Sequence, residues 1–180
     1  GSKVSSKLAV LVNMLDKVDN LIIGGGMGYT FIKAQGGQIG SSLHEDDLMP
    51  QALEILAQAK EKGVNISLST ETVVADGFSN DANTQVVDSF AIPEGWEGMD
   101  AGEKSLENWK DIILNSKTIL WNGPVGVFEM PTFAKGTLKI AELLDKSIGD
   151  TGFSRSGRTC YYNRVFFHYA LGTIFSAPPI

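Results

Sequence analysis

The sequence predicts an α/β fold over residues 1–146: a three-layer α/β/α domain with a mostly parallel sheet. Short apolar segments alternate there with longer amphipathic segments, which is the pattern of strands followed by helices. The apolar segments are hydrophobic almost throughout, as strands covered by helices on both faces are. Two of them end in glycine-rich turns, at 24–26 and 122–126, and ligands of parallel sheets bind beyond the carboxyl ends of the strands.

The first helix is predicted to begin at Ser5, whose hydroxyl can serve as the N-cap. Its apolar positions recur every three or four residues: Leu8, Leu11, Leu15 and Val18. A short strand is expected over 21–26, where "LIIGGG" ends in three glycines. A second helix is expected over 29–35, and the glycine pair 36–37 ends it.

A third helix is predicted within 47–63, with Pro50 in its first turn and Gly63 as its stop. One face of this helix is apolar: Leu48, Ala52, Leu56 and Ala59. The acidic stretch 44–47 is expected to cap or solvate the start of this helix.

The second half of the domain continues the alternation of strands and helices. Strands are predicted where β-branched residues gather: 64–69, 72–76, 86–90 and 118–121. A helix is expected over 103–115, and a last helix over about 131–145. The layering is Rossmann-like, although neither glycine turn has the spaced glycine fingerprint of dinucleotide enzymes.

The bulk properties exclude several functional classes. The chain has 180 residues, a net charge of −6 and a pI near 4.9, so neither nucleic acid nor an anionic membrane is expected as its partner. The single Cys160 excludes an internal disulfide and a cysteine zinc cluster, and we expect no metal ligands. No apolar run reaches membrane-spanning length and no signal peptide is recognisable, which favours the cytoplasm.

The composition changes abruptly after Lys146. Residues 1–146 carry a net charge of −8, whereas residues 147–180 carry +2 and contain all three arginines and Cys160. We therefore predict a nucleotide-binding domain over 1–146 and an anomalous tail over 147–180.

Lysines at the start of the chain suggest a phosphate site. Lys3 and Lys7 are four residues apart and would share one face of a helix that began near Ser5. Two ammonium groups beside a helix N-terminus can hold a polyphosphate. Spacing alone nevertheless favours a solvated lysine pair preceded by a cloning scar at residues 1–2, and each glycine turn taken alone favours a plain strand-to-helix connection.

Four longer segments of the sequence bear on these alternatives, because they resemble a known family. The segments are "GSKVSSKLAVLVNMLDKVDNLIIGGGMGYTFIKAQG", "ETVVADGFSNDANT", "IPEGWEGMDAGEKS" and "TILWNGPVGVFEMPTFAKGT". Together they closely resemble the C-terminal, nucleotide-binding domain of phosphoglycerate kinase, nearly without gaps to about Lys146. This family transfers a phosphoryl group between ATP and 3-phosphoglycerate, with Mg²⁺ on the nucleotide.

The resemblance implies a set of ATP- or ADP-binding residues. It implies that Lys3 and Lys7 contact nucleotide phosphates and that Lys3 has a catalytic role. It also implies that Gly1 and Ser2 belong to the same motif. The resemblance also implies an adenine site between Gly24, Gly25 and Gly26 on one side and Gly98 and Met99 on the other. It further implies a phosphate-side loop of Asn122, Gly123 and Pro124, with Glu129 accepting the ribose hydroxyls.

The same resemblance implies what the chain lacks. It opens at the phosphate lysines, so the preceding strand and the domain that binds 3-phosphoglycerate are expected to be missing. The family's Gly-Gly-Gly-Asp magnesium loop is not recognisable, and the similar Gly149-Asp150-Thr151 is interpreted as chance. A frameshift, a retained intron or alternative splicing would each produce such a tail.

The remaining conspicuous side chains are expected to be structural. His44 and His168 are interpreted as non-catalytic, the three tryptophans as packing residues, and Cys160 as no tuned nucleophile. Two hypotheses follow. The chain is either the nucleotide half of a phosphoglycerate kinase, or a non-catalytic truncated product that binds adenine nucleotides weakly.

Overall fold

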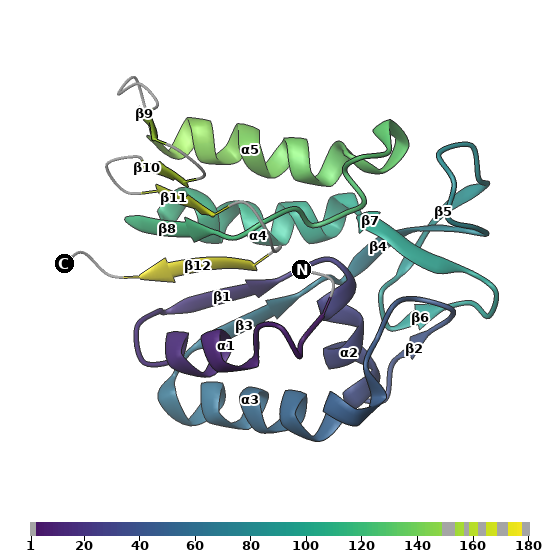
Figure 1. The fold of residues 1–180 in the computed structure, drawn as a ribbon, viewed down its shortest axis with the longest axis horizontal. Coiled ribbons are helices and arrows are strands. Elements are labelled where there is room, and N and C mark those ends of the chain that lie inside the picture. Colours follow the sequence, from purple (N-terminus) through teal and green to yellow (C-terminus); the bar gives the residue numbers. More distant parts are fainter. Residues whose placement is uncertain (1–2, 149–153, 157–158, 162–164, 169–172, 178–180) are drawn as a thin grey trace.

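A seven-stranded sheet lies between two layers of helices (Figure 1). In this computed structural model the described residues are 3–148, 154–156, 159–161, 165–168 and 173–177, with side chains described to residue 147. One face of the sheet is covered by α1 (Leu8–Met14), α2 (Gly26–Ala34) and α3 (Met49–Lys62). The other face is covered by α4 (Glu103–Asn115) and α5 (Lys135–Ile148). The three-layer α/β/α prediction is thereby confirmed.

The strand order of the large sheet is β3-β1-β12-β8-β11-β10-β9. Its strands are β1 (Asn20–Ile23), β3 (Asn65–Leu68), β8 (Thr118–Trp121), β9 (Ser154–Ser156), β10 (Thr159–Tyr161), β11 (Val165–His168) and β12 (Thr173–Ala177). β1 pairs in parallel with β3, and β8 with β11, whereas β12 pairs antiparallel with both β1 and β8. Because β10 is also antiparallel to its neighbours, the described strands that oppose the common direction both come from residues 147–180.

The central position of β12 was not predicted. This strand lies between β1 and β8, with Ile174 in register with Ile22 on one side and Trp121 on the other. The predicted boundary at residue 146 therefore separates two compositions, while strands from both sides of it share one sheet. Gly149-Asp150-Thr151 lies outside the described residues.

Strand β1 divides the core into two halves because its side chains alternate between the faces of the sheet. Leu21 and Ile23 are buried among the residues of α1, α2 and α3, whereas Ile22 is buried with residues of α4 and α5. Burying one such side chain contributes roughly 1.5–3 kcal/mol, so this short strand anchors both helical layers. On the α4 side, Trp109 is fully buried and its indole N–H donates to Ser67 Oγ at 3.1 Å.

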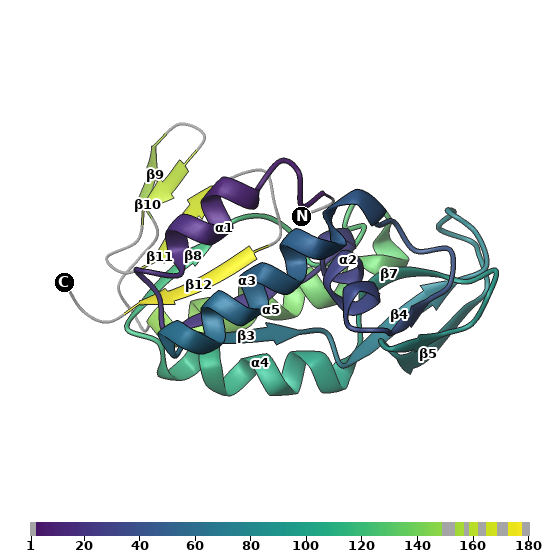
Figure 2. The same cartoon turned by 90° about the horizontal axis from the view of Figure 1, so that it is seen from below.

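A second, antiparallel sheet projects from one end of the domain, as two views show (Figures 1 and 2). Its order is β5-β4-β7, with β4 (Glu71–Ala75), β5 (Thr84–Asp88) and β7 (Glu97–Ala101). Two short strands, β2 (Gln38–Ile39) and β6 (Ala91–Ile92), pair in parallel beside it. Single 3₁₀ turns, Asp46–Leu48 and Pro131–Phe133, precede α3 and α5.

Several predicted boundaries are confirmed. Helix α4 and strand β8 have the expected bounds, and α3 ends at Gly63, whose φ of 71° is the left-handed conformation that glycine adopts readily. The tryptophans also pack as expected, with Trp109 and Trp121 buried and Trp96 partly buried.

Two local predictions are wrong, and a third is right only in part. Ser5 does not cap the first helix, which begins at Leu8 with Lys7 in the N-cap position, because the Ser5 hydroxyl donates to Glu45. The acidic stretch 44–47 does not cap α3 through a side chain, since Glu45 bonds Ser5 and Asp46 pairs with Lys33. Asp46 and Asp47 are nevertheless exposed in the 3₁₀ turn before α3, as the solvated alternative predicts. Helix α2 begins at Gly26 rather than near residue 29, directly after the glycine turn.

Candidate functional site

The two predicted glycine turns lie against each other. Gly24 follows β1 and Asn122 follows β8, at the carboxyl ends of strands that run in the same direction. A Cβ atom at Gly24 would lie 2.8 Å from Val125 Cγ1, so no larger residue than glycine fits between the turns without a shift. The structure therefore brings together two of the predicted site segments that are far apart in sequence.

The conformation of the first turn, Gly24–Gly26, is set by main-chain dihedral angles and a main-chain hydrogen bond. Gly25 has a φ of 70° and is the N-cap of α2, and its carbonyl oxygen accepts a hydrogen bond from Gly28 N–H at 2.9 Å. A positive φ at this point suits glycine. The turn thus exposes main-chain atoms beside the N-terminus of a helix, a position that favours anionic or polar ligand atoms.

The second turn, Asn122–Gly126, contains an unsatisfied polar atom. Asn122 is 7% exposed, and its Oδ1 is buried without a hydrogen-bond partner among the described residues. A buried acceptor of this kind costs free energy unless a ligand or water donates to it. If the amide is rotated by 180°, its N–H group takes this place and can donate to a phosphate oxygen, so the position is suited to a polar ligand.

Contacts with α5 and β7 hold the second turn in place. Val125 N–H donates to Thr137 Oγ1 at 3.2 Å, and Val127 N–H donates to the carbonyl oxygen of Met99 at 2.9 Å. A Cβ at Gly126 would lie 2.2 Å from Asp100 Oδ1, so the turn packs directly on this carboxylate.

Asp100 is a buried acid that the sequence reasoning missed. It is 2% exposed, and it accepts hydrogen bonds from Gly136 N–H at 2.7 Å and from its neighbour Ala101 N–H at 2.9 Å. Burial raises the pKa of Asp100 to about 6, although these hydrogen bonds and the charge of Lys135 act in the opposite direction. Two glycines, Gly126 and Gly136, leave room for its carboxylate. They are the sequence feature that could have indicated a buried side chain here.

The predicted wall at Gly98 and Met99 is tightly packed. Gly98 N–H donates to Ser42 Oγ at 2.9 Å, and a Cβ at Gly98 would lie 1.9 Å from the Tyr29 hydroxyl oxygen. Burial raises the pKa of Tyr29 well above its ordinary value, so the phenol stays neutral. Met99 is 2% exposed and its side chain packs with Ala75 and Phe133, so Met99 meets the second turn through its carbonyl oxygen.

The lysine segment lies before α1 rather than within it. Lys7 N–H donates to Val4 O at 2.8 Å, and Ser6 Oγ donates to Lys3 O at 2.9 Å, which forms a turn over residues 3–7. Val4 is fully buried and anchors this turn in the core, whereas Lys3 is exposed and Lys7 half-buried. Gly1 and Ser2 lie outside the described residues.

Glu129 and the remaining loop residues are accessible. Glu129 is exposed and forms no hydrogen bond or ion pair within the described part of the chain, while Gly123 and Pro124 are half-buried. Gly123 has a φ of 98°, which a residue with a side chain rarely adopts. The carboxylate is therefore free to accept hydroxyl groups from a ligand.

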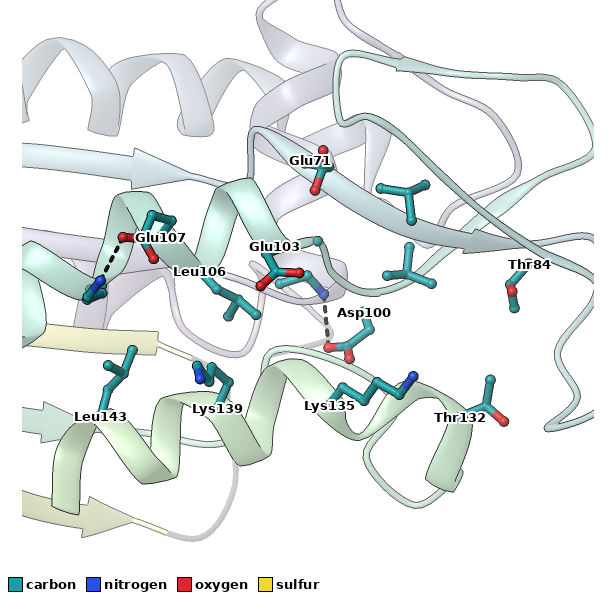
Figure 3. A pocket seen from close by; sticks show the side chains of 15 residues that line it. Glu71, Thr84, Asp100, Glu103, Leu106, Glu107, Thr132, Lys135, Lys139 and Leu143 are labelled. Atoms are coloured by element: carbon teal, nitrogen blue, oxygen red, sulfur yellow. Dashed lines mark hydrogen bonds and ion pairs between the residues drawn. The ribbon is translucent and has the colours of Figure 1, made fainter. Parts of the chain in front are cut away.

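A separate cavity of about 590 Å³ lies between α4, α5 and the small sheet (Figure 3). Asp100, Glu103 and Lys135 point towards it, but none of the residues predicted to bind nucleotide lines it. Most of its charges are already paired: Lys110 with Glu107 at 2.7 Å, Lys139 with Glu142 at 3.5 Å, and Lys104 with Glu71 at 3.3 Å. Its chemistry therefore gives no reason to place the ligand there.

The described residues offer no cluster of metal ligands. No group of three or more His, Cys, Asp or Glu side chains among them is placed to hold a metal ion. No helix in this part of the chain has the length and apolar character needed to cross a membrane. His44 is a structural residue, since its Nδ1 lies 2.8 Å from Ser42 O and its Nε2 lies 2.9 Å from Lys33 Nζ.

The sequence model of the phosphoglycerate kinase family matches residues 1–157. The match extends past residue 146 and includes Gly149-Asp150-Thr151. Phosphoglycerate kinase of Porphyromonas gingivalis is 52% identical over 157 residues, covering 87% of this chain and 38% of that protein. The enzyme of Leptospira biflexa is 48% identical over 151 residues, covering 84% of this chain and again 38% of that protein.

A solved structure agrees with these matches. Phosphoglycerate kinase from Coxiella burnetii superposes with a TM-score of 0.79 at 41% identity, covering 81% of this chain and 38% of that protein. The chain thus spans well under half the length of the relatives that it matches.

Proposed function

Because the chain belongs to the phosphoglycerate kinase family, as the match over residues 1–157 shows, we propose that it binds ATP or ADP at the two glycine turns. The observation that carries this proposal is the contact between Gly24 and Val125 beside the unsatisfied Oδ1 of Asn122. Two turns at adjoining strand ends, with one buried polar atom lacking a partner, are suited to a ligand that is partly apolar and partly polar.

Each predicted residue has a role that suits its surroundings. The base would lie against main-chain atoms at Gly24–Gly26, with Gly98 and Met99 opposite. Asn122, Gly123 and Pro124 would face the phosphates, towards which Lys3 and Lys7 bring positive charge. The unpaired carboxylate of Glu129 would accept the ribose hydroxyls and fix the orientation of the sugar.

The proposed reaction is phosphoryl transfer between ATP and 3-phosphoglycerate, with Lys3 as the catalytic residue. Such transfer requires alignment of the two substrates and stabilisation of charge on the phosphoryl oxygens. Mg²⁺ on the nucleotide would neutralise part of that charge. Lys3 and Lys7 can hold the outer phosphates, and no described residue is assigned to the ion itself.

Calorimetric titration with MgADP tests the nucleotide site. We expect measurable, weak binding that Glu129→Ala reduces, because a carboxylate that accepts two hydroxyls is lost. Glu61→Ala is the matched control, since Glu61 is an exposed acid on α3 without a described partner. Equal affinities of the chain and Glu129→Ala would contradict the ribose assignment.

A second proposal concerns turnover: this 180-residue chain alone is a nucleotide-binding module and does not catalyse the reaction. Substrate alignment can lower a barrier by roughly 7–11 kcal/mol, and nothing in the described residues is assigned to 3-phosphoglycerate. A coupled assay on the purified chain should therefore give no turnover above that of a Lys3→Ala, Lys7→Ala double variant. Robust turnover that disappears in the double variant would contradict this proposal.

A further inference from the structure

The segment Ser42–Asp46, here called the 42–46 bridge, contacts two separate parts of the candidate site. At its start, Ser42 is 1% exposed and its hydroxyl oxygen accepts a hydrogen bond from Gly98 N–H. Near its end, the carboxylate of Glu45 bonds Ser5, in the turn that carries Lys3 and Lys7. The bridge therefore joins the Gly98 side of the site to the lysines.

The bond between Glu45 and Ser5 uses both carboxylate oxygens. Ser5 Oγ donates to Oε1 at 2.6 Å, and Ser5 N–H donates to Oε2 at 3.1 Å. Partial burial opposes ionisation, yet hydrogen bonds from Ser5 and Val4 and the charge of Lys3 hold the pKa of Glu45 below its ordinary value. The carboxylate is thus ionised at neutral pH and fixes the position of the turn from 40 residues away.

Other contacts fix the bridge itself to α2. Glu45 N–H donates to Thr30 Oγ1 at 3.1 Å, and Lys33 Nζ donates to Asp46 Oδ1 at 2.6 Å. Lys33 also contacts His44, which bonds the carbonyl of Ser42. Helix α2 begins at the first glycine turn. The same helix therefore holds both the bridge and the main-chain atoms proposed to contact the nucleotide.

We propose that Glu45 is a positioning residue, which sets the turn of Lys3 and Lys7 at a fixed distance from the two glycine turns. The inference rests on the proposed nucleotide site and adds a residue that does not itself contact the ligand. A lysine is a flexible point charge, so its contribution to phosphate binding depends on how well its main chain is placed. Without Glu45, the described residues hold the turn through the burial of Val4, the contacts within residues 3–7 and the hydrogen bond from Leu11 N–H to the carbonyl oxygen of Lys7.

A competing effect has the opposite sign. Glu45 is negative, so its removal would also reduce repulsion of a phosphate held by Lys3. Two variants separate the effects, because Glu45→Gln removes the charge and keeps one acceptor, whereas Glu45→Ala removes both. Positioning predicts that alanine weakens binding more than glutamine does, while repulsion predicts tighter binding in both variants.

The test compares MgADP with adenosine, which lacks phosphates. We expect Glu45→Ala to weaken MgADP binding about tenfold, the equivalent of about 1.4 kcal/mol, and to leave adenosine binding unchanged. In a Lys3→Ala, Lys7→Ala background the same substitution should have little further effect, because the turn then carries no charge to place. Asp47→Ala is the matched control, since Asp47 is an exposed neighbouring acid that bonds none of the described residues.

Amide hydrogen exchange provides a readout that needs no nucleotide. Glu45→Ala should speed exchange at Lys7, whose N–H bonds Val4 within the turn, and Asp47→Ala should not. If the unaltered chain binds neither ligand, the proposed function fails while the exchange result still reports on the turn. Unchanged exchange at Lys7, an equal loss of MgADP and adenosine binding, or tighter MgADP binding in Glu45→Ala would each overturn the proposal.

Discussion

The two glycine turns occupy equivalent places in the fold but are stabilised differently. Gly24–Gly26 is fixed by main-chain geometry: the positive φ of Gly25 and the hydrogen bond from Gly28 that starts α2. Asn122–Gly126 is fixed by side chains from elsewhere, with Asp100 packed against Gly126 and Thr137 bonded to Val125. The conformation of the first turn should therefore change little when neighbouring side chains or the pH change. The conformation of the second turn should depend on both.

The largest expected effect is that of a methyl group inside the second turn. In Gly126→Ala the new Cβ would lie 2.2 Å from Asp100 Oδ1 and 2.8 Å from the carbonyl oxygen of Phe133. Neither neighbour can move freely, so we expect the free energy of unfolding to fall by about 3 kcal/mol or more. In Gly24→Ala the new Cβ would lie 2.8 Å from Val125 Cγ1 and 3.1 Å from Val125 Cβ. The clash is with one side chain and with no main-chain or carboxylate oxygen, so we expect a smaller loss of about 1 kcal/mol. Urea denaturation of both variants measures the difference, and equal losses would remove the contrast between the turns.

The second effect is that the free energy of unfolding depends on pH through the carboxyl group of Asp100. Its folded-state pKa of about 6 lies above the ordinary aspartate value of 3.8. The proton therefore adds stability that is complete below about pH 4 and is lost as the pH rises through 6, by on the order of 3 kcal/mol. Comparison with Asp100→Asn isolates this contribution from other acids, such as Glu45, whose pKa is lowered and whose contribution has the opposite sign.

Denaturation of both proteins at several pH values tests this expectation. The unaltered chain should gain stability relative to Asp100→Asn as the pH falls from 7 to 4. A constant difference over this range would show that Asp100 does not titrate near pH 6.

The smallest effect concerns one hydrogen bond. Thr137→Val preserves the shape of the side chain and removes the acceptor of Val125 N–H, so we expect a loss of about 1 kcal/mol. Amide exchange should accelerate at Val125 and stay unchanged at Gly28, whose partner lies within the first turn. Equal acceleration at both amides would indicate that the turns open together.

Elements specified by nearby residues could be predicted from the sequence. The bounds of α4 and the end of α3 at Gly63 follow from periodicity and from a glycine at the stop position. The three successive glycines after an apolar segment indicate a turn, although the structure ends β1 at Ile23 and begins α2 at Gly26, within the glycines.

Features that depend on distant partners could not be predicted. Ser5 is a reasonable N-cap by local rules, but Glu45 takes its hydroxyl. Strand β7 has a glycine and an aspartate in its middle, residues that strands disfavour, and its Asp100 is stabilised by Gly136 N–H from α5. The resemblance named the candidate residues, whereas the contacts that hold them, at Asp100, Thr137 and Glu45, required the structure.

We propose that one adenine nucleotide binds where the two glycine turns meet. Amide chemical shifts of the isotopically labelled chain, recorded during a titration with MgADP, test it most directly. We expect the largest shifts at Gly24–Gly26, Gly98 and Asn122–Gly123, with smaller shifts at Lys3 and Lys7. Shifts confined to residues of the separate cavity, such as Glu103, Leu106 and Lys139, or no shifts at saturating nucleotide, would contradict it.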